Sequence, residues 1–259
     1  MDTFTQKNVL ITGASSGIGK EFAKQLAGQG ATLILTARSE AALKELAHSL
    51  SEQHKVQTHV FCQDLGQPGG AQLLAQKIQQ AGLQVDVVIN NAGFGKWGPF
   101  ESVDAATYEA MLNLNIHAVV ALTHFFLPAM LERGEGGFIN VASTAGFQPV
   151  PYFSTYSASK AFVISFSEGL WREYKDRGVV FTCLCPGGTD TNFHEVSQMD
   201  KRKLIALASS EKVAQLALQA FLKGKLNVIA GAKNYLLANS IRFAPRRWVT
   251  EVTAAMFRP

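Results

Sequence analysis

The feature that most restricts the fold of this chain is a glycine-rich turn between an apolar strand and a helix. Residues 8–12 predict a short buried strand, and residues 20–29 predict the helix that follows. In the turn, Gly13 allows a tight bend, Gly17 lets the backbone approach a pyrophosphate, and Gly19 lets the helix pack on the strand. Because a helix N-terminus presents N–H donors and partial positive charge, this stretch predicts a dinucleotide site rather than a plain connection.

Strands and helices continue to alternate through most of the chain. Further strands are predicted at 32–36, 56–62, 85–90, 138–142, 179–185 and 226–230, and helices at 40–53, 69–80, 104–112, 113–133, 154–175 and 211–222. This alternation predicts one α/β domain over residues 1–259. Its core is expected to be a Rossmann-type doubly wound parallel sheet of about seven strands, with helices on both faces. Residues 192–209 are polar and irregular, and the tail 231–259 mixes aromatic residues with arginines.

Composition excludes several functional classes. The formal net charge is +4, and the basic residues are spread along the chain apart from Lys201–Lys203 and the arginines of the tail. Nucleic-acid binders concentrate Lys and Arg on one face or helix, so no nucleic acid is expected as a partner. The three cysteines give no disulfide framework, and the six histidines show no ligand spacing, so no metal is expected.

The hydropathy pattern predicts no membrane-spanning segment. No signal peptide is expected before the first strand. The longest apolar run, residues 118–131, is too short to span a bilayer and contains His124 and Pro128. Together with the cysteine usage, these features favour a reduced, cytoplasmic compartment. The helix that holds this run is apolar on more than one side, which suggests packing against a second subunit.

The end of the second strand bears on the choice of cofactor. Sites for NAD usually place Asp or Glu there to bind the ribose hydroxyls. This chain has Ala37-Arg38-Ser39 instead. With no carboxylate to repel a 2′-phosphate, and with an arginine able to pair with one, the segment predicts NADP(H) in preference to NAD(H). The alternative is that Arg38 merely faces solvent.

Two other strand ends carry polar side chains. After the third strand, the Asp64 carboxylate could accept a hydrogen bond from an adenine amine or cap the helix expected at 69–80, and the sequence leaves both open. The fourth strand closes with Asn90–Gly93, whose small and amide side chains suit a ligand crevice at the carboxyl ends of parallel strands. Turn formation alone would also explain that composition.

A tyrosine and a lysine are spaced to share one face of a helix. Tyr156 and Lys160 are four residues apart in the helix predicted at 154–175. An ammonium about 4 Å away would lower the pKa of the phenol from ~10 to about 7, where general acid–base catalysis is efficient. Taken alone, the spacing also fits a solvated pair on a helix surface.

Together these motifs resemble the short-chain dehydrogenase/reductase family. The matching residues are Thr12, Gly13, Gly17 and Gly19 of TGxxxGxG, Asp64, Asn90–Gly93 (NNAG), Asn115, Ser143, Tyr156 and Lys160 of YxxxK, and Pro186-Gly187 with Thr191. The resemblance covers residues 8–195. It implies an oxidoreductase that transfers a hydride between a nicotinamide cofactor and a ketone, aldehyde or secondary alcohol. It also implies a homodimer or homotetramer, although the long tail departs from many members.

The resemblance implies a role for each matched residue. Tyr156 would be the general acid in carbonyl reduction, Ser143 would hydrogen-bond the substrate oxygen, and Lys160 would bind the nicotinamide ribose and lower the pKa of Tyr156. Asn115, preferred to Asn113 for its spacing from Ser143, would hold a water in a proton relay. The expected cofactor-binding positions are Gly13, Ser15, Ser16, Gly17, Ile18, Gly19, Arg38, Asp64, Leu65, Asn91, Ala92, Gly93, Tyr156, Lys160, Pro186, Gly187, Thr189 and Thr191.

The substrate is expected under three loops, at about 94–100, 144–153 and 188–209. Their aromatic side chains predict an apolar pocket and therefore a hydrophobic carbonyl or alcohol substrate; these are Phe94, Trp97, Phe100, Phe147, Tyr152, Phe153 and Phe193. Residues 148–151 resemble the branch of the family that contains hydroxysteroid and long-chain ketoacyl reductases.

Two other hypotheses concern activity and location. The same fold could serve a non-catalytic NADP-binding sensor or interaction protein, but a sensor does not need the proton donor that Ser143, Tyr156 and Lys160 would build. The basic aromatic tail, residues 231–259, also suggests peripheral contact with a membrane.

Overall fold

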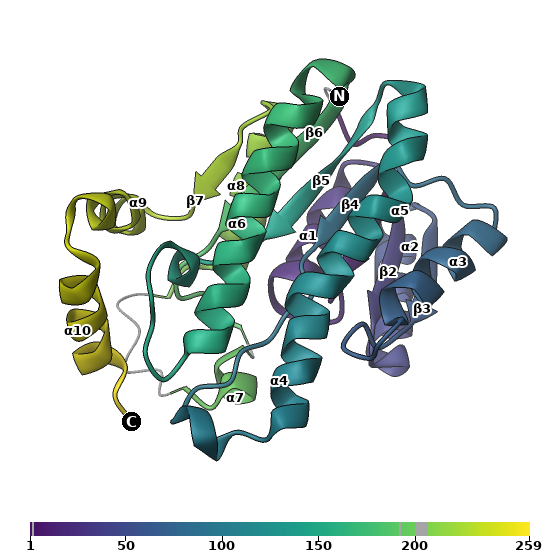
Figure 1. Cartoon of the computed structure of the whole chain (residues 1–259). Helices are drawn as coiled ribbons and strands as arrows, with labels where there is room; N and C mark the ends of the chain where they lie inside the picture. The colour runs from purple at the N-terminus through teal and green to yellow at the C-terminus, as the bar shows by residue number, and fades with distance from the viewer. Residues whose placement is uncertain (2, 192, 200–206) are drawn as a thin grey trace.

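The sheet is parallel and has seven strands, as the sequence predicts (Figure 1). The computed structural model describes residue 1 and residues 3–191, 193–199 and 207–259. The strands are β1 (Asn8–Thr12), β2 (Thr32–Ala37), β3 (Thr58–Cys62), β4 (Val87–Asn90), β5 (Gly136–Val141), β6 (Val179–Cys185) and β7 (Asn227–Ile229). Their order is β3-β2-β1-β4-β5-β6-β7.

Two layers of helices bury the two faces of the sheet (Figure 1). One apolar cluster joins the sheet to α1 (Gly17–Gly28), α2 (Glu40–His54) and α8 (Ser210–Leu222). A second cluster on the other face joins it to α3 (Gly70–Gln80), α5 (Ala118–Arg133) and the C-terminal half of α6 (Ser154–Tyr174). Because both faces are covered, the central strands are continuous apolar runs and not alternating ones.

The strand order reverses between β1 and β4. After β1 the chain builds outward through β2 and β3, and after α3 it returns to place β4 on the other side of β1. The connections from β1 and β4 therefore diverge to opposite faces. A crevice forms outside the carboxyl ends of strands at such a reversal, and this is where parallel α/β sheets bind their ligands.

A continuous helix of 29 residues, Ala105–Arg133, crosses one face of the sheet. It consists of α4 (Ala105–Leu112), a π-helical turn (Asn113–His117) and α5. By length and composition alone it could cross a membrane, but the core helix of a globular protein passes the same test, and 44% of its most apolar window is buried in the protein. The absence of a membrane-spanning segment therefore stays a prediction.

Several elements differ from the sequence-based expectation. Helix α1 begins at Gly17, inside the glycine turn, and not at residue 20. The segment expected to be irregular contains the short helix α7 (Phe193–Ser197), while residues 200–206 of that segment lie outside the described residues. The tail forms α9 (Ala232–Ser240) and α10 (Arg246–Phe257). Short 3₁₀ turns occupy Phe100–Ser102, Thr144–Phe147, Lys175–Arg177 and Ile241–Phe243.

A chain of buried hydrogen bonds fixes α6 on the sheet. The Asn90 side-chain amide donates to Asn140 Oδ1 at 2.9 Å, and Asn140 Nδ2 donates to Ser167 Oγ at 2.9 Å. The Ser167 hydroxyl in turn donates to the Val163 carbonyl. All three polar side chains are almost fully buried. The network therefore sets the position of the helix that carries Tyr156 relative to β4 and β5.

Replacement of the central amide tests this network. Asn140→Leu is expected to lower the free energy of unfolding by about 2 kcal/mol, because the buried Asn90 amide loses its acceptor while the volume is kept. Urea unfolding followed by circular dichroism measures the change. In the control, Asn239→Leu, the amide bonds only within α9 near the surface, and a change below about 0.5 kcal/mol is expected. Equal effects of the two substitutions would contradict the structural role of Asn140.

Candidate active site

The ends of β1 and β4 are tied together through one threonine. Thr12 Oγ1 accepts hydrogen bonds from the backbone N–H groups of Asn91 at 3.0 Å and Ala92 at 2.9 Å. In return, Asn91 Nδ2 donates to the Thr12 carbonyl at 2.9 Å. Gly13 and Gly17 have positive φ values of 67° and 54°, which L side chains rarely adopt. A Cβ on Gly19 would overlap the Gly13 carbonyl and the Asn91 amide, so this glycine is needed for close packing.

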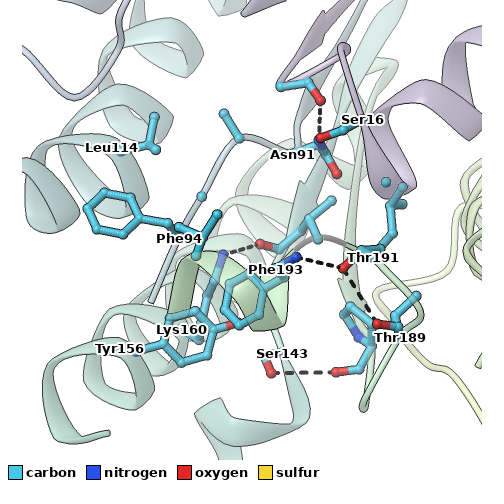
Figure 2. Close-up of a pocket in the computed structure, with 18 of the residues that line it drawn as sticks. Ser16, Asn91, Phe94, Leu114, Ser143, Tyr156, Lys160, Thr189, Thr191 and Phe193 are labelled. Atoms are coloured by element: carbon cyan, nitrogen blue, oxygen red, sulfur yellow. Dashed lines mark hydrogen bonds between the residues drawn. The ribbon is translucent and has the colours of Figure 1, made fainter. Parts of the chain in front are cut away.

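The glycine turn opens into a cavity of about 550 Å³ that extends to Tyr156 (Figure 2). Of the expected cofactor-binding positions, all but Gly19 line this cavity. The donors suit a dinucleotide, because the N-terminus of α1 faces one end and the amide and carbonyl groups after β4 line the middle. The residues present therefore fit a nicotinamide dinucleotide, with Gly19 acting behind the turn to hold its shape.

Arg38 and Asp64 line the end of the cavity beyond the glycine turn. Arg38 follows β2 directly and its side chain is exposed. Asp64 Oδ1 accepts a hydrogen bond from the Gly66 N–H at 2.8 Å. The alternative that Asp64 caps the next helix is wrong, because α3 begins at Gly70 and Gly69 takes the N-cap position.

Tyr156 lines the cavity from the first turn of α6, beside the apolar side chains. Its ring stacks on Phe153 at 4.4 Å between centroids and contacts Phe193 at 5.3 Å, and Figure 2 shows Phe193 over the phenol. Burial raises the pKa of Tyr156 to about 12, and the neighbouring Ser143 hydroxyl opposes this rise. The phenol is therefore a neutral proton donor at physiological pH.

The sequence-based expectation of a pKa near 7 for Tyr156 is wrong for this structure. It assumed that the ammonium of Lys160 dominates, but in this structure burial of the phenol is the largest influence on its pKa and raises it. Lys160 Nζ lies 5.8 Å from the centre of the Tyr156 ring and donates to the Val141 carbonyl at 2.8 Å. The ammonium is thus directed at the end of β5.

Lys160 is itself buried, and burial lowers its pKa to about 8, with Cys183 and Cys185 nearby opposing the shift. These two thiols are buried on one face of β6 with their sulfur atoms 3.8 Å apart, and both are free. At neutral pH the lysine keeps its proton and needs acceptors. A buried ammonium in contact with an open cavity is a costly arrangement, and such groups concentrate at functional sites.

Ser143 follows β5 and begins the 3₁₀ turn Thr144–Phe147. Its Oγ accepts a hydrogen bond from the Ala145 N–H at 3.1 Å and donates to the Pro186 carbonyl at 3.5 Å. The first bond fixes the side-chain rotamer, and the second is long and easily exchanged. Ser143 can therefore turn its proton toward an oxygen bound beside Tyr156 without leaving a buried donor unpaired.

Asn115 sits in the π-helical turn, fully buried behind the cavity wall. Its Nδ2 donates to the Phe94 carbonyl at 2.9 Å and to Ser159 Oγ at 3.0 Å, while its Oδ1 accepts from the Phe94 N–H. A Cβ on Gly93 would meet both Asn115 Oδ1 at 3.0 Å and Lys160 Nζ at 3.2 Å. Asn115 therefore holds the segment after β4 next to Lys160. Its place in a π-helical turn is in keeping with this, because such turns are frequent at functional sites.

The segment after β6 closes the cavity on the side opposite Asn91. The Thr189 hydroxyl donates to the Gly187 carbonyl at 3.1 Å, and Thr191 Oγ1 accepts from the Phe193 N–H at 3.3 Å. A Cβ on Gly17 would touch the Thr191 methyl at 3.0 Å. The loop after β6 thus packs directly on the glycine turn, and Figure 2 shows Thr189 and Thr191 on this wall.

The substrate end of the cavity is apolar, but its lining differs from the prediction. Phe94, Phe153 and Phe193 line it, and Trp97 packs on the same cluster. The prediction is wrong for Trp97, Phe100, Phe147 and Tyr152, which lie outside the lining. Phe100 is 66% exposed and stacks on Tyr108, because its 3₁₀ turn faces outward. Phe147 packs on a separate apolar cluster that contains Val163 and Cys183, and Tyr152 has a positive φ of 62°.

Other lining residues are absent from the sequence-based prediction. Leu114, Val150, Met199 and Phe257 complete the apolar wall. Leu114 lies in the π-helical turn, and Phe257 comes from the end of α10. No local motif marks these positions, since each reaches the cavity only through tertiary packing. Thr12 is different: its place immediately before Gly13 in the glycine turn was a usable signal for the strand-end tie.

Comparison with known proteins gives one consistent result. Residues 7–202 match the family described as short chain dehydrogenase. A very-long-chain 3-oxoacyl-CoA reductase from Anas platyrhynchos is 37% identical over 195 residues, which cover 73% of this chain and 62% of that protein. The ketoacyl reductase HetN from Nostoc sp. is 33% identical over 231 residues, covering 88% of this chain and 80% of that protein. The chain thus spans less than two thirds of the first of these relatives.

Solved structures agree in fold. A short-chain dehydrogenase from Sphingobium yanoikuyae in complex with NADPH has a TM-score of 0.83 at 30% identity, covering 92% of this chain and 93% of its own. A short-chain dehydrogenase/reductase from Burkholderia phymatum in complex with NAD has a TM-score of 0.81 at 24% identity, covering 92% and 94%, and shows the fold alone. The chain belongs to the short-chain dehydrogenase/reductase family of oxidoreductases.

The buried ammonium of Lys160 predicts a pH-dependent cost in stability. Because folding lowers the pKa of Lys160 from 10.5 to about 8, the unfolded chain binds this proton more tightly than the folded one. The cost is fully present below pH 8 and disappears as pH rises toward 10.5. Lys160→Met is therefore expected to raise the free energy of unfolding by about 2 kcal/mol at neutral pH, with a smaller gain at high pH.

Urea unfolding of the cofactor-free protein near neutral pH and near pH 10 measures this difference. Lys212→Met, at an exposed lysine of α8, serves as the matched control and is expected to change stability by less than about 0.5 kcal/mol at either pH. A Lys160→Met protein that is less stable than the wild type at neutral pH would show that the ammonium does not carry this cost.

Proposed function

We propose that the protein is an NADP(H)-dependent reductase of hydrophobic ketones, with the reverse oxidation of secondary alcohols at the same site. The observation that supports this most directly is the position of the Tyr156 phenol. It is neutral, close to Ser143, and lines the cavity together with both the apolar side chains and the glycine turn. A proton donor in that position is what carbonyl reduction requires.

The proposed chemistry divides between the cofactor and this chain. The bound dinucleotide supplies the hydride in reduction and accepts it in oxidation. Ser143 and Tyr156 orient the carbonyl oxygen with two hydrogen bonds, which strengthen as negative charge develops on that oxygen. The Tyr156 proton then passes to the oxygen, so the ketone carbon gains a hydride and its oxygen gains a proton. A secondary alkoxide is a stronger base than a phenolate, so the transfer is favourable even with a raised phenol pKa.

Lys160 and Asn115 are proposed to restore the proton on Tyr156. Lys160 Nζ already has one acceptor in the Val141 carbonyl, and its other protons are free to reach the ribose hydroxyls of a bound dinucleotide. Asn115 Oδ1 lies next to the backbone of Gly93, which places an acceptor behind Lys160 for a bridging water. This relay would carry protons from solvent to the phenol after each reduction.

The proposed substrate is a ketone with an apolar body. The wall built by Phe94, Val150, Phe153, Met199 and Phe257 offers dispersion contacts and few hydrogen-bond partners, which favours acyl or ring carbon over a sugar. Relatives named for 3-oxoacyl-CoA and ketoacyl reduction make 3-oxoacyl thioesters the first class to test. NADPH oxidation, followed optically with a panel of 3-oxoacyl thioesters, bulky ketones and ketose sugars, tests the ranking.

Removal of one hydroxyl tests the catalytic assignment. Tyr156→Phe is expected to lower kcat for ketone reduction by at least about 100-fold while NADPH affinity changes less than about three-fold, because the phenol donates the proton but contributes little to the phosphate and ribose contacts. Stopped-flow turnover and NADPH fluorescence titration measure the two effects.

Tyr152→Phe is the matched control, since this tyrosine lies outside the cavity lining and is expected to retain wild-type kcat. Retained turnover in Tyr156→Phe would overturn the proposed mechanism. A wild-type protein that binds NADPH and oxidises none of it with the whole panel would favour the sensor hypothesis.

A charge reversal tests the proposed preference for NADP(H). Arg38→Asp is expected to weaken NADPH binding roughly ten-fold or more and to shift the ratio of kcat/KM values toward NADH, because the 2′-phosphate would lose a charge-assisted partner and meet a carboxylate. Arg177→Asp, at an exposed arginine outside the cavity lining, controls for net charge and is expected to leave the ratio unchanged. If Arg38→Asp also leaves it unchanged, Arg38 has no part in the phosphate site.

A further inference from the structure

The tail helices α9 and α10 lie outside the two helical layers that cover the sheet. Figure 1 shows them beyond β7, at one edge of the molecule. Helix α10 carries two neighbouring stripes of side chains at a spacing of four residues. One stripe, Val249, Thr253 and Phe257, is turned to the protein, and the other, Trp248, Val252 and Met256, is turned to solvent.

The inner stripe attaches α10 firmly to the substrate end of the active site. Thr253 Oγ1 donates to the Pro149 carbonyl at 3.0 Å, and Trp97 Nε1 donates to the Phe257 carbonyl at 2.8 Å. The Phe257 ring packs on the apolar cluster that contains Tyr156 and lines the cavity. The helix is therefore held in a fixed orientation. Its outer stripe is exposed because of the way the helix packs, and not because the end of the chain frays.

Exposed apolar side chains also occur in the two short elements that precede α10. Trp248 is 69% exposed and Val252 is 59% exposed, while Phe243, in the 3₁₀ turn that precedes α10, is 90% exposed. Leu236 of α9 is 68% exposed. Large apolar side chains exposed together within one short segment indicate a contact with another apolar phase or partner. We call Leu236, Phe243, Trp248, Val252 and Met256 the tail apolar surface.

The charges around this surface have one dominant sign. Within residues 231–259 the basic side chains are Lys233, Arg242, Arg246, Arg247 and Arg258, and the acidic one is Glu251. Arg242, Arg246 and Arg247 are exposed and lie next to Phe243 and Trp248 in sequence. Aromatic and aliphatic side chains with flanking arginines are the pattern of helices that lie in the headgroup region of an anionic bilayer.

We propose that the tail apolar surface docks on an anionic phospholipid membrane, with α10 lying parallel to the interface. Charge complementarity favours this occupant over a second copy of the chain, because each tail carries an excess of basic side chains and pairing two tails would bring like charges together. Anionic headgroups would instead attract them, and Trp248 would enter the interface. Docking would also bring the part of the cavity wall that Phe257 forms close to the bilayer, where apolar ketones concentrate. The docking proposal does not depend on the proposed reaction.

Vesicle co-sedimentation of the full chain tests this proposal. The wild type is expected to bind vesicles of phosphatidylglycerol and phosphatidylcholine in equal parts, to bind weakly to phosphatidylcholine alone, and to be released by high salt. The double variants Trp248→Ser/Val252→Ser and Arg246→Glu/Arg247→Glu are each expected to lower the vesicle partition coefficient roughly ten-fold or more.

Matched controls test whether vesicle binding depends on this surface, and not on any exposed apolar residue or on net charge alone. Leu73→Ser removes an exposed leucine of α3, and Lys212→Glu/Lys223→Glu makes the same change in net charge on α8 and the turn that follows it. Both are expected to bind like the wild type, and unchanged thermal midpoints verify folding. The proposal is overturned if the wild type does not bind anionic vesicles or if the tail variants bind equally well. It is also overturned if light scattering shows a lipid-independent oligomer that the tail variants dissociate, which would assign the surface to a second copy.

Discussion

The hydrogen bonds that Thr12 makes across the reversal of the sheet hold the whole site together. Two adjacent backbone N–H groups after β4 share its hydroxyl, and the Asn91 amide returns a bond to its carbonyl. This tie fixes the glycine turn against the segment after β4. Asn115 holds the next residues of that segment from the other side. The two strand ends that diverge to opposite faces are thus rigid relative to each other, and the cavity between them is preformed.

Helix α6, which carries Tyr156 and Lys160, is fixed to this frame, and the burial of these two polar side chains costs folding free energy. Lys160 is buried with a carbonyl as its hydrogen-bond acceptor, and Tyr156 is buried among aromatic rings. Both groups have pKa values displaced in the direction that burial dictates, upward for the phenol and downward for the ammonium. The sheet and its two apolar clusters supply stability, and the buried polar network through Asn140 transmits the position of the sheet to α6. The C-terminal half of α6 therefore packs into the stabilising core, while its first two turns carry Tyr156 and Lys160.

Local sequence was sufficient for features whose physical cause is local. The apolar runs predicted the strands, their alternation with helices predicted the parallel doubly wound sheet, and the glycine spacing predicted the turn at the end of β1. The positions of the predicted cofactor-contact residues around one cavity follow from the same logic, because the carboxyl ends of parallel strands meet at one edge. The pKa of Tyr156 could not be predicted in this way. An estimate from the spacing of two charged residues does not include burial, and burial is the largest influence on this pKa.

The sequence by itself determined the class of fold, the family and the set of polar residues gathered at the strand ends, because each depends on periodicity or on motifs within a few residues. Tertiary structure alone decided the apolar wall, where Leu114, Val150, Met199 and Phe257 meet from segments far apart in the chain. It also decided that the tail forms two helices, with Thr253 and Phe257 turned inward and Trp248 turned to solvent. The physical reason is that a side chain acquires its partners from packing between elements, and no local pattern contains that information.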